Sequence, residues 1–266
     1  MRKSIKYSQN FLIDPNLVKK IIKLSNIATS DIVYEIGAGK GIITQELSQL
    51  AKNVISFELD ENFYKKLVAK FRGNSVIQIV HGDFLASDPP KQSFKVFSNI
   101  PFNITSQVIK KLTFEDNAPE ESYLIVQKEA AFKFAGVPFD RKNDQVAVLL
   151  HPWFEFNVLY KFKPQDFFPI PKVSIILLKI KKRHYSLIDI KHRPLYQDFV
   201  VHEFKHKKNR SNVDFKSWIL LFNSFLKQSE SKQKIVVGSY KKLLLEQRKL
   251  KKINRTRIDV NWRRFK

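Results

Sequence analysis

The chain has 266 residues, of which 43% are hydrophobic and 7 are Gly. This length and composition suit one large or two modest globular domains and exclude a fibrous or disordered protein. It contains no Cys, which excludes disulfides and thiolate metal sites and fits a reducing, cytoplasmic location. The basic N-terminal sequence is not followed by an apolar segment, and no apolar run is long enough to span a bilayer. We therefore expect neither a signal peptide nor a membrane partner.

Charge is distributed unevenly along the chain. The 48 Lys and Arg residues outnumber 25 Asp and Glu residues, for a net charge of +23. Residues 1–180 hold 24 basic and 18 acidic residues, whereas residues 181–266 hold 24 and 7, a net +17. Such a basic segment predicts a polyanionic partner, most plausibly nucleic acid, although a highly solvated surface is the alternative.

Short apolar runs alternate with helical patterns over the first two thirds of the chain. The runs predict strands at 31–37, 53–60, 75–83, 95–99, 122–129 and 173–180, and the apolar spacing predicts helices at 41–51, 62–71 and 104–114. The run at 145–156 fits either a helix or a strand. This alternation is typical of βαβ units and predicts an α/β fold with a mostly parallel sheet.

The pattern changes after about residue 182. Residues 215–226 and 239–250 have helical apolar spacing with Lys and Arg on the opposite face, and the basic end of the chain carries Trp262 and Phe265. We therefore expect an α/β domain over 1–180 and a smaller, basic, all-α domain with a tail over 181–266.

A glycine-rich loop follows the first predicted strand. In EIGAGKG, Gly37, Gly39 and Gly41 allow a sharp turn and a close approach of the backbone to a ligand. The spacing is neither the dinucleotide fingerprint nor a P-loop. Taken alone, the loop could also be an ordinary tight turn.

Acidic residues close the next two predicted strands. Glu58 can accept hydrogen bonds from both hydroxyls of a ribose, and Asp83 can accept one from an exocyclic amine while Phe84 lies against a ring. Each acid alone could be a solvated turn residue. In sequence with the glycine loop, they predict a pocket for an adenosine-containing ligand.

The fourth strand ends in Asn99-Ile100-Pro101-Phe102. The lone pair of an amine on a purine is delocalised, which makes the amine a poor nucleophile. The Asn99 side-chain oxygen and the Ile100 carbonyl could accept its two hydrogens and so direct the lone pair at a methyl donor, while Phe102 stacks on the base. The alternative is an Asx turn.

Six motifs in this order resemble the ribosomal RNA adenine N6-methyltransferases, the Erm and KsgA/Dim1 enzymes. They are YSQNFL (7–12), EIGAGKG (35–41), FELD (57–60), HGDF (81–84), NIPF (99–102) and DFFPIPKVS (166–174). The resemblance covers about residues 4–180. It implies a Rossmann-like class I methyltransferase domain that uses S-adenosylmethionine.

The resemblance also assigns roles to individual residues. Those that it places at the cofactor are Gln9, Asn10, Leu12, Gly37, Gly39, Glu58, Leu59, Asp83, Phe84 and Asn99. Of these, Gly37 is expected near the methionine part, Glu58 at the ribose, and Asp83 with Phe84 at the adenine. Those that it places in catalysis are Asn99, Ile100, Pro101, Phe102 and Phe167, with Phe102 and Phe167 on either side of the target adenine. Many relatives have Tyr where this chain has Phe102, so a role for a phenol is not carried over.

Within the family, this chain resembles the Erm enzymes more than the KsgA/Dim1 enzymes in its NIPF, LTFED and SYLIVQKE segments. That similarity implies a monomer that dimethylates one adenine of 23S rRNA, free or in an assembling large subunit, and so confers macrolide, lincosamide and streptogramin B resistance. The alternatives are a small-subunit rRNA adenine dimethyltransferase and a non-catalytic RNA-binding relative.

Residues 202–206 spell H-E-x-x-H, the zinc-protease motif. Lys205, Lys207, Lys208 and Arg210 crowd this segment and would repel a dication, no third ligand is evident, and no core-helix pattern surrounds it. We therefore expect no metal, and interpret the segment as the polar face of a helix near RNA.

Overall fold

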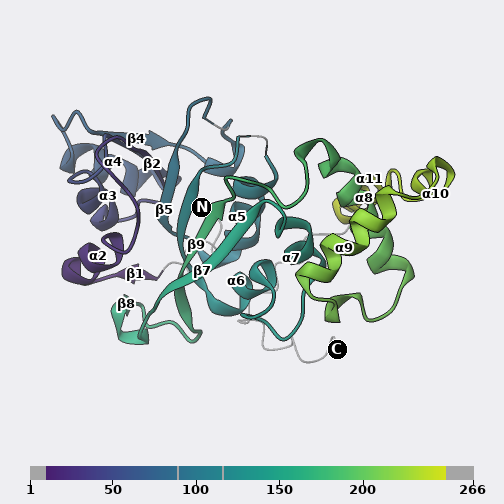
Figure 1. Cartoon of the computed structure of the whole chain (residues 1–266). Coiled ribbons are helices and arrows are strands. Elements are labelled where there is room, and N and C mark those ends of the chain that lie inside the picture. Colours follow the sequence, from purple (N-terminus) through teal and green to yellow (C-terminus); the bar gives the residue numbers. More distant parts are fainter. Residues whose placement is uncertain (1–9, 89, 116, 250–266) are drawn as a thin grey trace. The chain divides into compact units, whose positions relative to one another are not determined.

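Figure 1 shows the protein as a computed structural model, which describes residues 10–88, 90–115 and 117–249. The chain divides into two compact units. Of the described residues, the first comprises those from 10 to 135 together with 154–184, and the second comprises 136–153 and 185–249. The chain therefore enters the second unit twice, and the boundary expected near residue 180 corresponds to the second entry.

A seven-stranded sheet forms the centre of the first unit. Its strands are β2 (Ile32–Ile36), β3 (Asn53–Glu58), β4 (Ile77–His81), β5 (Lys95–Asn99), β6 (Glu121–Gln127), β7 (Phe154–Lys161) and β9 (Ile175–Lys182). They lie in the order β4-β3-β2-β5-β6-β9-β7, and β9 runs in the opposite direction to the other six strands. The predicted α/β fold with a mostly parallel sheet is confirmed.

The helices of this unit are α2 (Pro15–Ile22), α3 (Ile42–Leu47), α4 (Glu61–Lys70), α5 (Thr105–Phe114) and α6 (Lys128–Ala135), with short 3-10 turns η1 (Phe84–Ala86), η2 (Phe102–Ile104) and η3 (Pro164–Asp166). Two of the helices, α2 and α4, are capped by the aspartate that precedes their first residue. Asp14 accepts a hydrogen bond from Asn16 N and Asp60 one from Asn62 N, both at 2.8 Å, which satisfies N–H groups of the first turn. The three predicted helices are present. Helices α2 and α6 were not predicted, and residues 128–129 begin α6 rather than end a strand.

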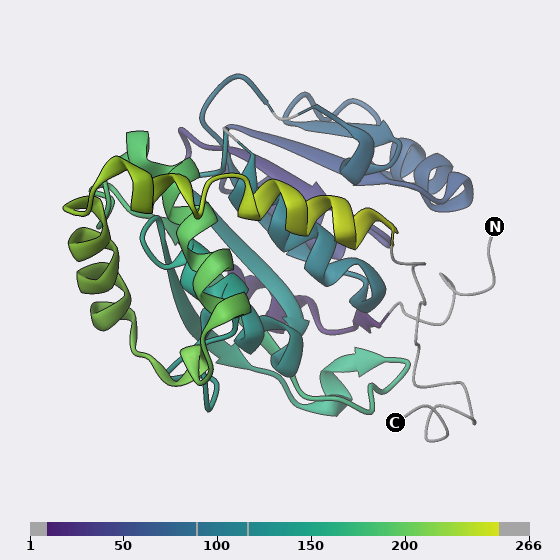
Figure 2. The same cartoon turned by 90° about the vertical axis from the view of Figure 1, so that its right-hand side faces the viewer.

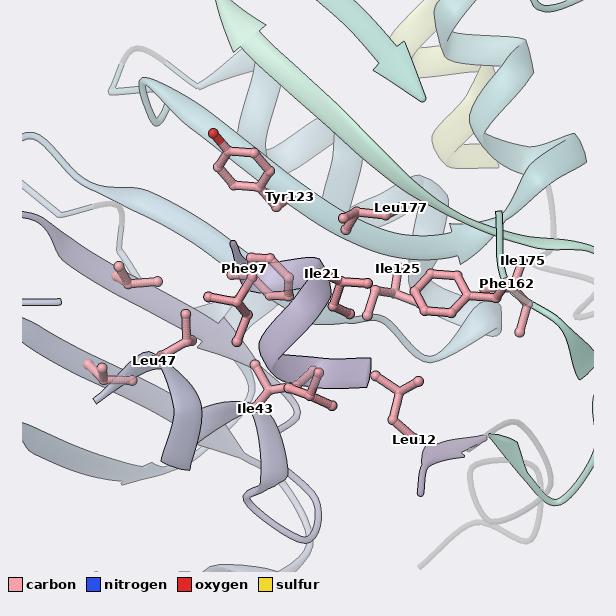
Figure 3. Packing of buried hydrophobic residues seen from close by; sticks show 14 of the residues in the cluster. Leu12, Ile21, Ile43, Leu47, Phe97, Tyr123, Ile125, Phe162, Ile175 and Leu177 are labelled. Carbon is pink, nitrogen blue, oxygen red and sulfur yellow. The ribbon is translucent and has the colours of Figure 1, made fainter. Parts of the chain in front are cut away.

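Alternating residues of the central strands build the core of the first unit. Tyr123, Ile125 and Leu177 are completely buried on one face and pack with Ile21 of α2 and Leu47 of α3 (Figure 3). The residues between them, such as Leu124 and Leu178, are equally buried. Both faces of the sheet are therefore covered, as the near-continuous apolar runs of these strands require.

A second, two-stranded sheet lies beside the first. Strand β1 (Phe11–Leu12) pairs antiparallel with β8 (Phe167–Phe168), in the register Phe11 to Phe168 and Leu12 to Phe167. Leu12 belongs to the same buried cluster as Phe162 at the end of β7, as Figure 3 shows. This small sheet thereby attaches the N-terminal strand to the segment that joins β7 to β9.

The second unit is helical, as expected for the basic part of the chain. Its helices are α7 (Gln145–Leu150), α8 (Arg193–His206), α9 (Phe215–Leu226), α10 (Glu230–Lys234) and α11 (Ser239–Lys249), with 3-10 turns η4 (Ile190–His192) and η5 (Arg210–Asn212). The ring centroid of Phe199 on α8 lies 6.2 Å from that of Trp218 and 5.5 Å from that of Phe222. Both of these α9 side chains are fully buried. The ambiguous run at 145–156 becomes α7 followed by β7.

The H-E-x-x-H segment lies at the end of α8, which is a core helix. The expectation that no core-helix pattern surrounds it was wrong, because Tyr196, Phe199 and Val200 of the same helix are buried, on the face that Glu203 continues. Glu203 is 5% exposed and forms ion pairs with Lys207, at 2.9 Å, and with Arg210. Its carboxylate thus neutralises nearby cations. No cluster of His, Cys, Asp or Glu within the described residues could hold a metal ion.

None of the helices that the structure describes combines the length and apolarity needed to cross a bilayer.

Candidate functional site

Four of the predicted motifs meet at one edge of the sheet. Strands β2, β3, β4 and β5 are parallel neighbours, so their carboxyl ends lie together. The glycine loop follows β2, Glu58 ends β3, Asp83 follows β4 and Asn99 ends β5. In open α/β sheets, this edge is where ligands bind.

The backbone of the glycine loop is turned toward β3. The N–H groups of Gly37 and Ala38 donate to Phe57 O at 2.8 and 3.1 Å, and Gly39 N donates to Glu58 Oε2 at 2.8 Å. Gly39 has φ +55°, and a Cβ there would lie 2.9 Å from the Phe11 ring. The loop therefore requires glycine at this position, both for its conformation and for its close contact with β1.

A pocket of about 680 Å³ opens along the ends of β3 and β4, a volume typical of ligand sites. Residues that line it include Gly37, Glu58, Leu59, Asp83, Phe84 and Pro101. Glu58 is 3% exposed, and its oxygens accept hydrogen bonds from Gly39 N and Asp60 N, which fixes the carboxylate while leaving further lone pairs.

At the far end of this pocket, Asp83 Oδ1 accepts a hydrogen bond from Leu85 N at 2.9 Å. Phe84 is 5% exposed, and its ring packs against Phe57 with centroids 5.4 Å apart. Leu59, by contrast, exposes 53% of its surface. Carboxylates that flank an apolar surface suit a nucleoside, because the acids bind its hydroxyls and amine and the apolar groups contact the ring.

A second pocket adjoins the first and shares Gly37 and Pro101 with it. Residues that line it include Asn10, Leu12, Asn99, Ile100 and Phe102. A Cβ on Gly37 would have no neighbour closer than 3.9 Å, at Pro101 Cδ. A side chain at Gly37 would therefore make ordinary van der Waals contact with Pro101, at the position where the two pockets meet. The second pocket is small, about 40 Å³, so a ligand in the first pocket could extend past Gly37 toward Asn99 with only a narrow group.

Within the described part of the chain, a hydrogen bond to Asn10 orients the Asn99 side chain. Asn99 Nδ2 donates to the main-chain oxygen of Asn10 at 2.7 Å. Because a carbonyl oxygen can only accept, the amide nitrogen must face Asn10, and Oδ1 is the group left to accept a hydrogen bond. Ile100 is 1% exposed and its N–H donates to Ile125 O, so the residue next to Asn99 is anchored in the sheet.

The two aromatic rings expected at the target base differ in exposure. Phe102 begins η2, is partly buried and lines the pocket beside Asn99. Phe167 is only 1% exposed, because its ring packs edge-on against Phe162 at 5.2 Å within the core. Phe167 therefore cannot lie on one side of a bound base in this structure, contrary to the expectation. Gln9 lies outside the described residues.

One residue of the pocket was not singled out from the sequence. Glu35 is 1% exposed and is one of the residues that line the second pocket. Its Oε2 accepts hydrogen bonds from Thr44 Oγ1 at 2.5 Å and Ser56 Oγ at 2.7 Å. Burial raises the pKa of Glu35 to about 7, although both hydroxyls oppose this shift. An acid inside a buried strand is itself a signal that sequence analysis could have used.

The shifted pKa predicts how stability depends on pH. The pKa of Glu35 is about 7 in the folded protein, above its ordinary value of 4.5. Between pH 4.5 and 7, Glu35 is therefore protonated to a greater extent in the native state than in the unfolded chain. We expect Glu35 to contribute a fall of about 3 kcal/mol in the free energy of unfolding as the pH rises from about 4.5 to 7. Urea titrations of the wild type and Glu35→Gln will test this, since a neutral amide should weaken the dependence. Equal pH profiles would contradict it.

Comparison with known proteins agrees with this geometry. A family model described as "Ribosomal RNA adenine dimethylase" matches residues 1–235. An rRNA adenine N-6-methyltransferase of Escherichia coli is 35% identical over 246 residues, which cover 85% of this chain and 98% of that protein. The ribosomal RNA small subunit methyltransferase A of Caldanaerobacter subterraneus is 31% identical over 216 residues, 78% of this chain and 80% of that protein. The crystal structure of the 23S rRNA methyltransferase ErmE matches with a TM-score of 0.68 and 27% identity, over 80% of this chain and 84% of that one. The chain therefore belongs to the ribosomal RNA adenine dimethylase family and is an Erm-type rRNA adenine N6-methyltransferase.

Proposed function

We propose that this enzyme dimethylates N6 of one adenine in 23S rRNA, with S-adenosylmethionine as the methyl donor, and that the modification confers resistance to macrolides, lincosamides and streptogramin B. The observation that carries the proposal is the Asn99 carboxamide, whose nitrogen is held by Asn10 O while its oxygen remains an acceptor at the pocket. An amine with two hydrogens is the group that such an acceptor holds best.

The fit of the cofactor rests on the two joined pockets. Glu58 would accept hydrogen bonds from the ribose hydroxyls, and Asp83 with the surface of Leu59 and Phe84 would hold the adenine. The methionine part would pass Gly37, where the absence of a side chain leaves room, and reach Asn10 and Leu12. When bound, S-adenosylmethionine supplies an electrophilic methyl group.

The protein's own contribution to the reaction is positioning. Asn99 Oδ1 and the Ile100 carbonyl would accept the two hydrogens of the adenine amine, which directs its lone pair out of the ring plane. Phe102, in the same pocket, offers a ring face on which an extruded base can stack. Holding two groups in reactive geometry lowers the barrier without a strong base.

The choice of 23S rRNA rests on relative similarity. This chain is 35% identical to rRNA adenine N-6-methyltransferases along nearly their whole length, and 28–31% identical to small-subunit enzymes over about four fifths of theirs. The structural match named for 23S rRNA points the same way.

Labelling of purified rRNA tests the assignment. The wild type should transfer labelled methyl from S-adenosylmethionine to protein-free 23S rRNA and not to 16S rRNA, and mass mapping should find a single dimethylated adenine. Expression of the protein in a macrolide-sensitive bacterium should raise the concentration of macrolide that inhibits its growth. Labelling of 16S rRNA would favour the small-subunit enzyme, and a protein that binds RNA but not S-adenosylmethionine would favour the non-catalytic relative.

The helical unit supplies an RNA-binding surface in this proposal. Lys205 and Lys208 are exposed at the end of α8, next to Arg210 and Lys207, whose charges Glu203 offsets. A lysine that binds a phosphate releases a counterion, so removing one such lysine should flatten the log–log salt dependence by about 0.7 to 0.9. We expect Lys205→Ala and Lys208→Ala each to weaken rRNA binding and to reduce this slope. Lys65→Ala, which removes a lysine paired with Glu61 on α4, is the matched control. Salt-independent binding would contradict the prediction.

A further inference from the structure

The segment that joins β7 to β9 presents an exposed aromatic ring, Phe168, opposite Phe11, a residue that lines the second pocket. We propose that this segment, residues 162–174, binds an unpaired nucleotide adjacent to the target adenosine, with Phe168 stacked on its base and Lys163 and Lys172 at its phosphates. We call residues 162–174 the β8 lobe. The inference rests on the proposed rRNA substrate and extends it to a part of the substrate that does not react.

The pairing register decides which phenylalanine is available. Phe167 and Phe168 are consecutive in β8, so their side chains point to opposite sides of the strand. Phe167 is 1% exposed in the core, whereas Phe168 is 65% exposed, and Ile170, two residues further on, is 63% exposed. The lobe therefore directs apolar surface away from the core.

The exposed ring is held by a fixed backbone. Asn10 Nδ2 donates to Pro169 O at 2.5 Å, and Ile13 N donates to Asp166 O at 3.3 Å. Within the lobe, Lys163 N donates to Asp166 Oδ2 at 2.7 Å. In Figures 1 and 2, β8 lies where the lobe extends beyond the ends of β7 and β9. A prearranged ring loses little conformational entropy when it stacks on a base.

The lobe is continuous with the catalytic pocket. Phe168 pairs with Phe11 in the β1–β8 ladder, and Phe11 lines the pocket together with Asn99. Asn10 links the two directly, because its main-chain oxygen accepts from Asn99 Nδ2 and its side chain donates to Pro169 O. A nucleotide adjacent to one held at Asn99 would therefore lie close to the lobe.

Charge identifies the occupant as RNA rather than an apolar protein partner. Lys163 and Lys172 are exposed and line a groove of about 240 Å³ in the lobe. Asp166 is the sole acidic residue in the sequence of the lobe, and its carboxylate caps Lys163 N. Phe168 does not line this groove, but it lies between the two lysines in the sequence of the lobe. Aromatic side chains that stack on bases, combined with basic groups that follow the backbone, bind single-stranded nucleic acid without reading its sequence.

Fluorescence of a modified RNA will test the proposal. The probe is a 23S rRNA fragment that contains the mapped adenine, with 2-aminopurine on its 5′ or 3′ side in two separate RNAs. The wild type should quench one of the two, and Phe168→Ala should abolish that quenching and raise the Kd for RNA about 5- to 150-fold. Phe168→Tyr should retain both, because it keeps the ring. Val68→Ala, which truncates a 41% exposed side chain on α4, should change neither.

The outcomes separate this proposal from the proposed function. Phe168→Ala should bind S-adenosylmethionine as the wild type does by calorimetry, which shows that the protein is folded. If the wild type methylates 23S rRNA while Phe168→Ala keeps wild-type Kd and quenching, the β8 lobe proposal is wrong. A Phe168-dependent dimer in sedimentation, with no effect on RNA, would also overturn it. If the wild type methylates no 23S rRNA but quenching still depends on Phe168, the proposed function fails and the stacking role stands.

Discussion

Asn99→Ala is expected to reduce kcat for methyl transfer by about 100- to 1,000-fold, while the Kd for S-adenosylmethionine changes far less. The substitution removes the acceptor that orients the target amine, and the loss of one positioned polar group at a reacting centre typically costs about 10²–10³ in rate. Glu58 and Asp83, in the pocket along the ends of β3 and β4, remain in place, so the cofactor should still bind. Single-turnover transfer to 23S rRNA and calorimetry measure the two quantities separately.

Two further variants sharpen this test. In the wild type, Asn99 Nδ2 lies 2.7 Å from Asn10 O. Asn99→Asp keeps the shape of the side chain but replaces this donor with a carboxylate oxygen, which the carbonyl repels. Asn99→Asp should therefore be nearly as inactive as Asn99→Ala. Asn157→Ala removes an equivalent amide from an exposed position on β7 and should retain wild-type activity. More than a tenth of the wild-type rate in Asn99→Ala would show that this side chain does not orient the amine.

The candidate site could be predicted from sequence because its residues follow parallel strands. Once 31–37, 53–60, 75–83 and 95–99 are recognised as buried strands of βαβ units, their carboxyl ends must meet at one edge. The polar residues at those ends then share a site whatever the details of packing. The same reasoning gives no side-chain orientation. That Asn99 donates to Asn10 O depends on where an N-terminal segment 89 residues away returns to the sheet.

The features that sequence analysis missed depend on contacts between distant segments. Strands β1 and β8 have two residues each, too few to show any periodicity, yet their register decides that Phe167 is buried and Phe168 exposed. The 136–153 excursion is held in the helical unit by Asn143, which donates to Val213 O, 70 residues away. Helix α2, in contrast, had a readable start at Asp14-Pro15, an N-cap followed by a proline at the first helical position.

Glu58→Ala is expected to raise the Kd for S-adenosylmethionine about 100-fold or more. Hydrogen bonds to a charged group contribute about 1.5–3 kcal/mol each, and two ribose hydroxyls would lose their acceptor. The substitution also leaves Gly39 N without its buried acceptor, so lost affinity alone would not separate ribose binding from support of the glycine loop. Glu120→Ala, at an exposed carboxylate before β6, is the control for the general loss of a negative charge.

A thermodynamic cycle makes that separation. The affinities of the wild type and Glu58→Ala are measured for S-adenosylhomocysteine and for its 2′,3′-dideoxy analogue. If Glu58 binds the ribose, the wild type should strongly prefer the hydroxylated ligand and the variant should lose most of that preference, because the interaction is absent once either partner is removed. If Glu58 acts only through Gly39 and Asp60, both ligands should weaken by the same factor in the variant. The first outcome would establish that the carboxylate at the end of β3 recognises the nucleoside directly, and the second would assign it to the shape of the loop.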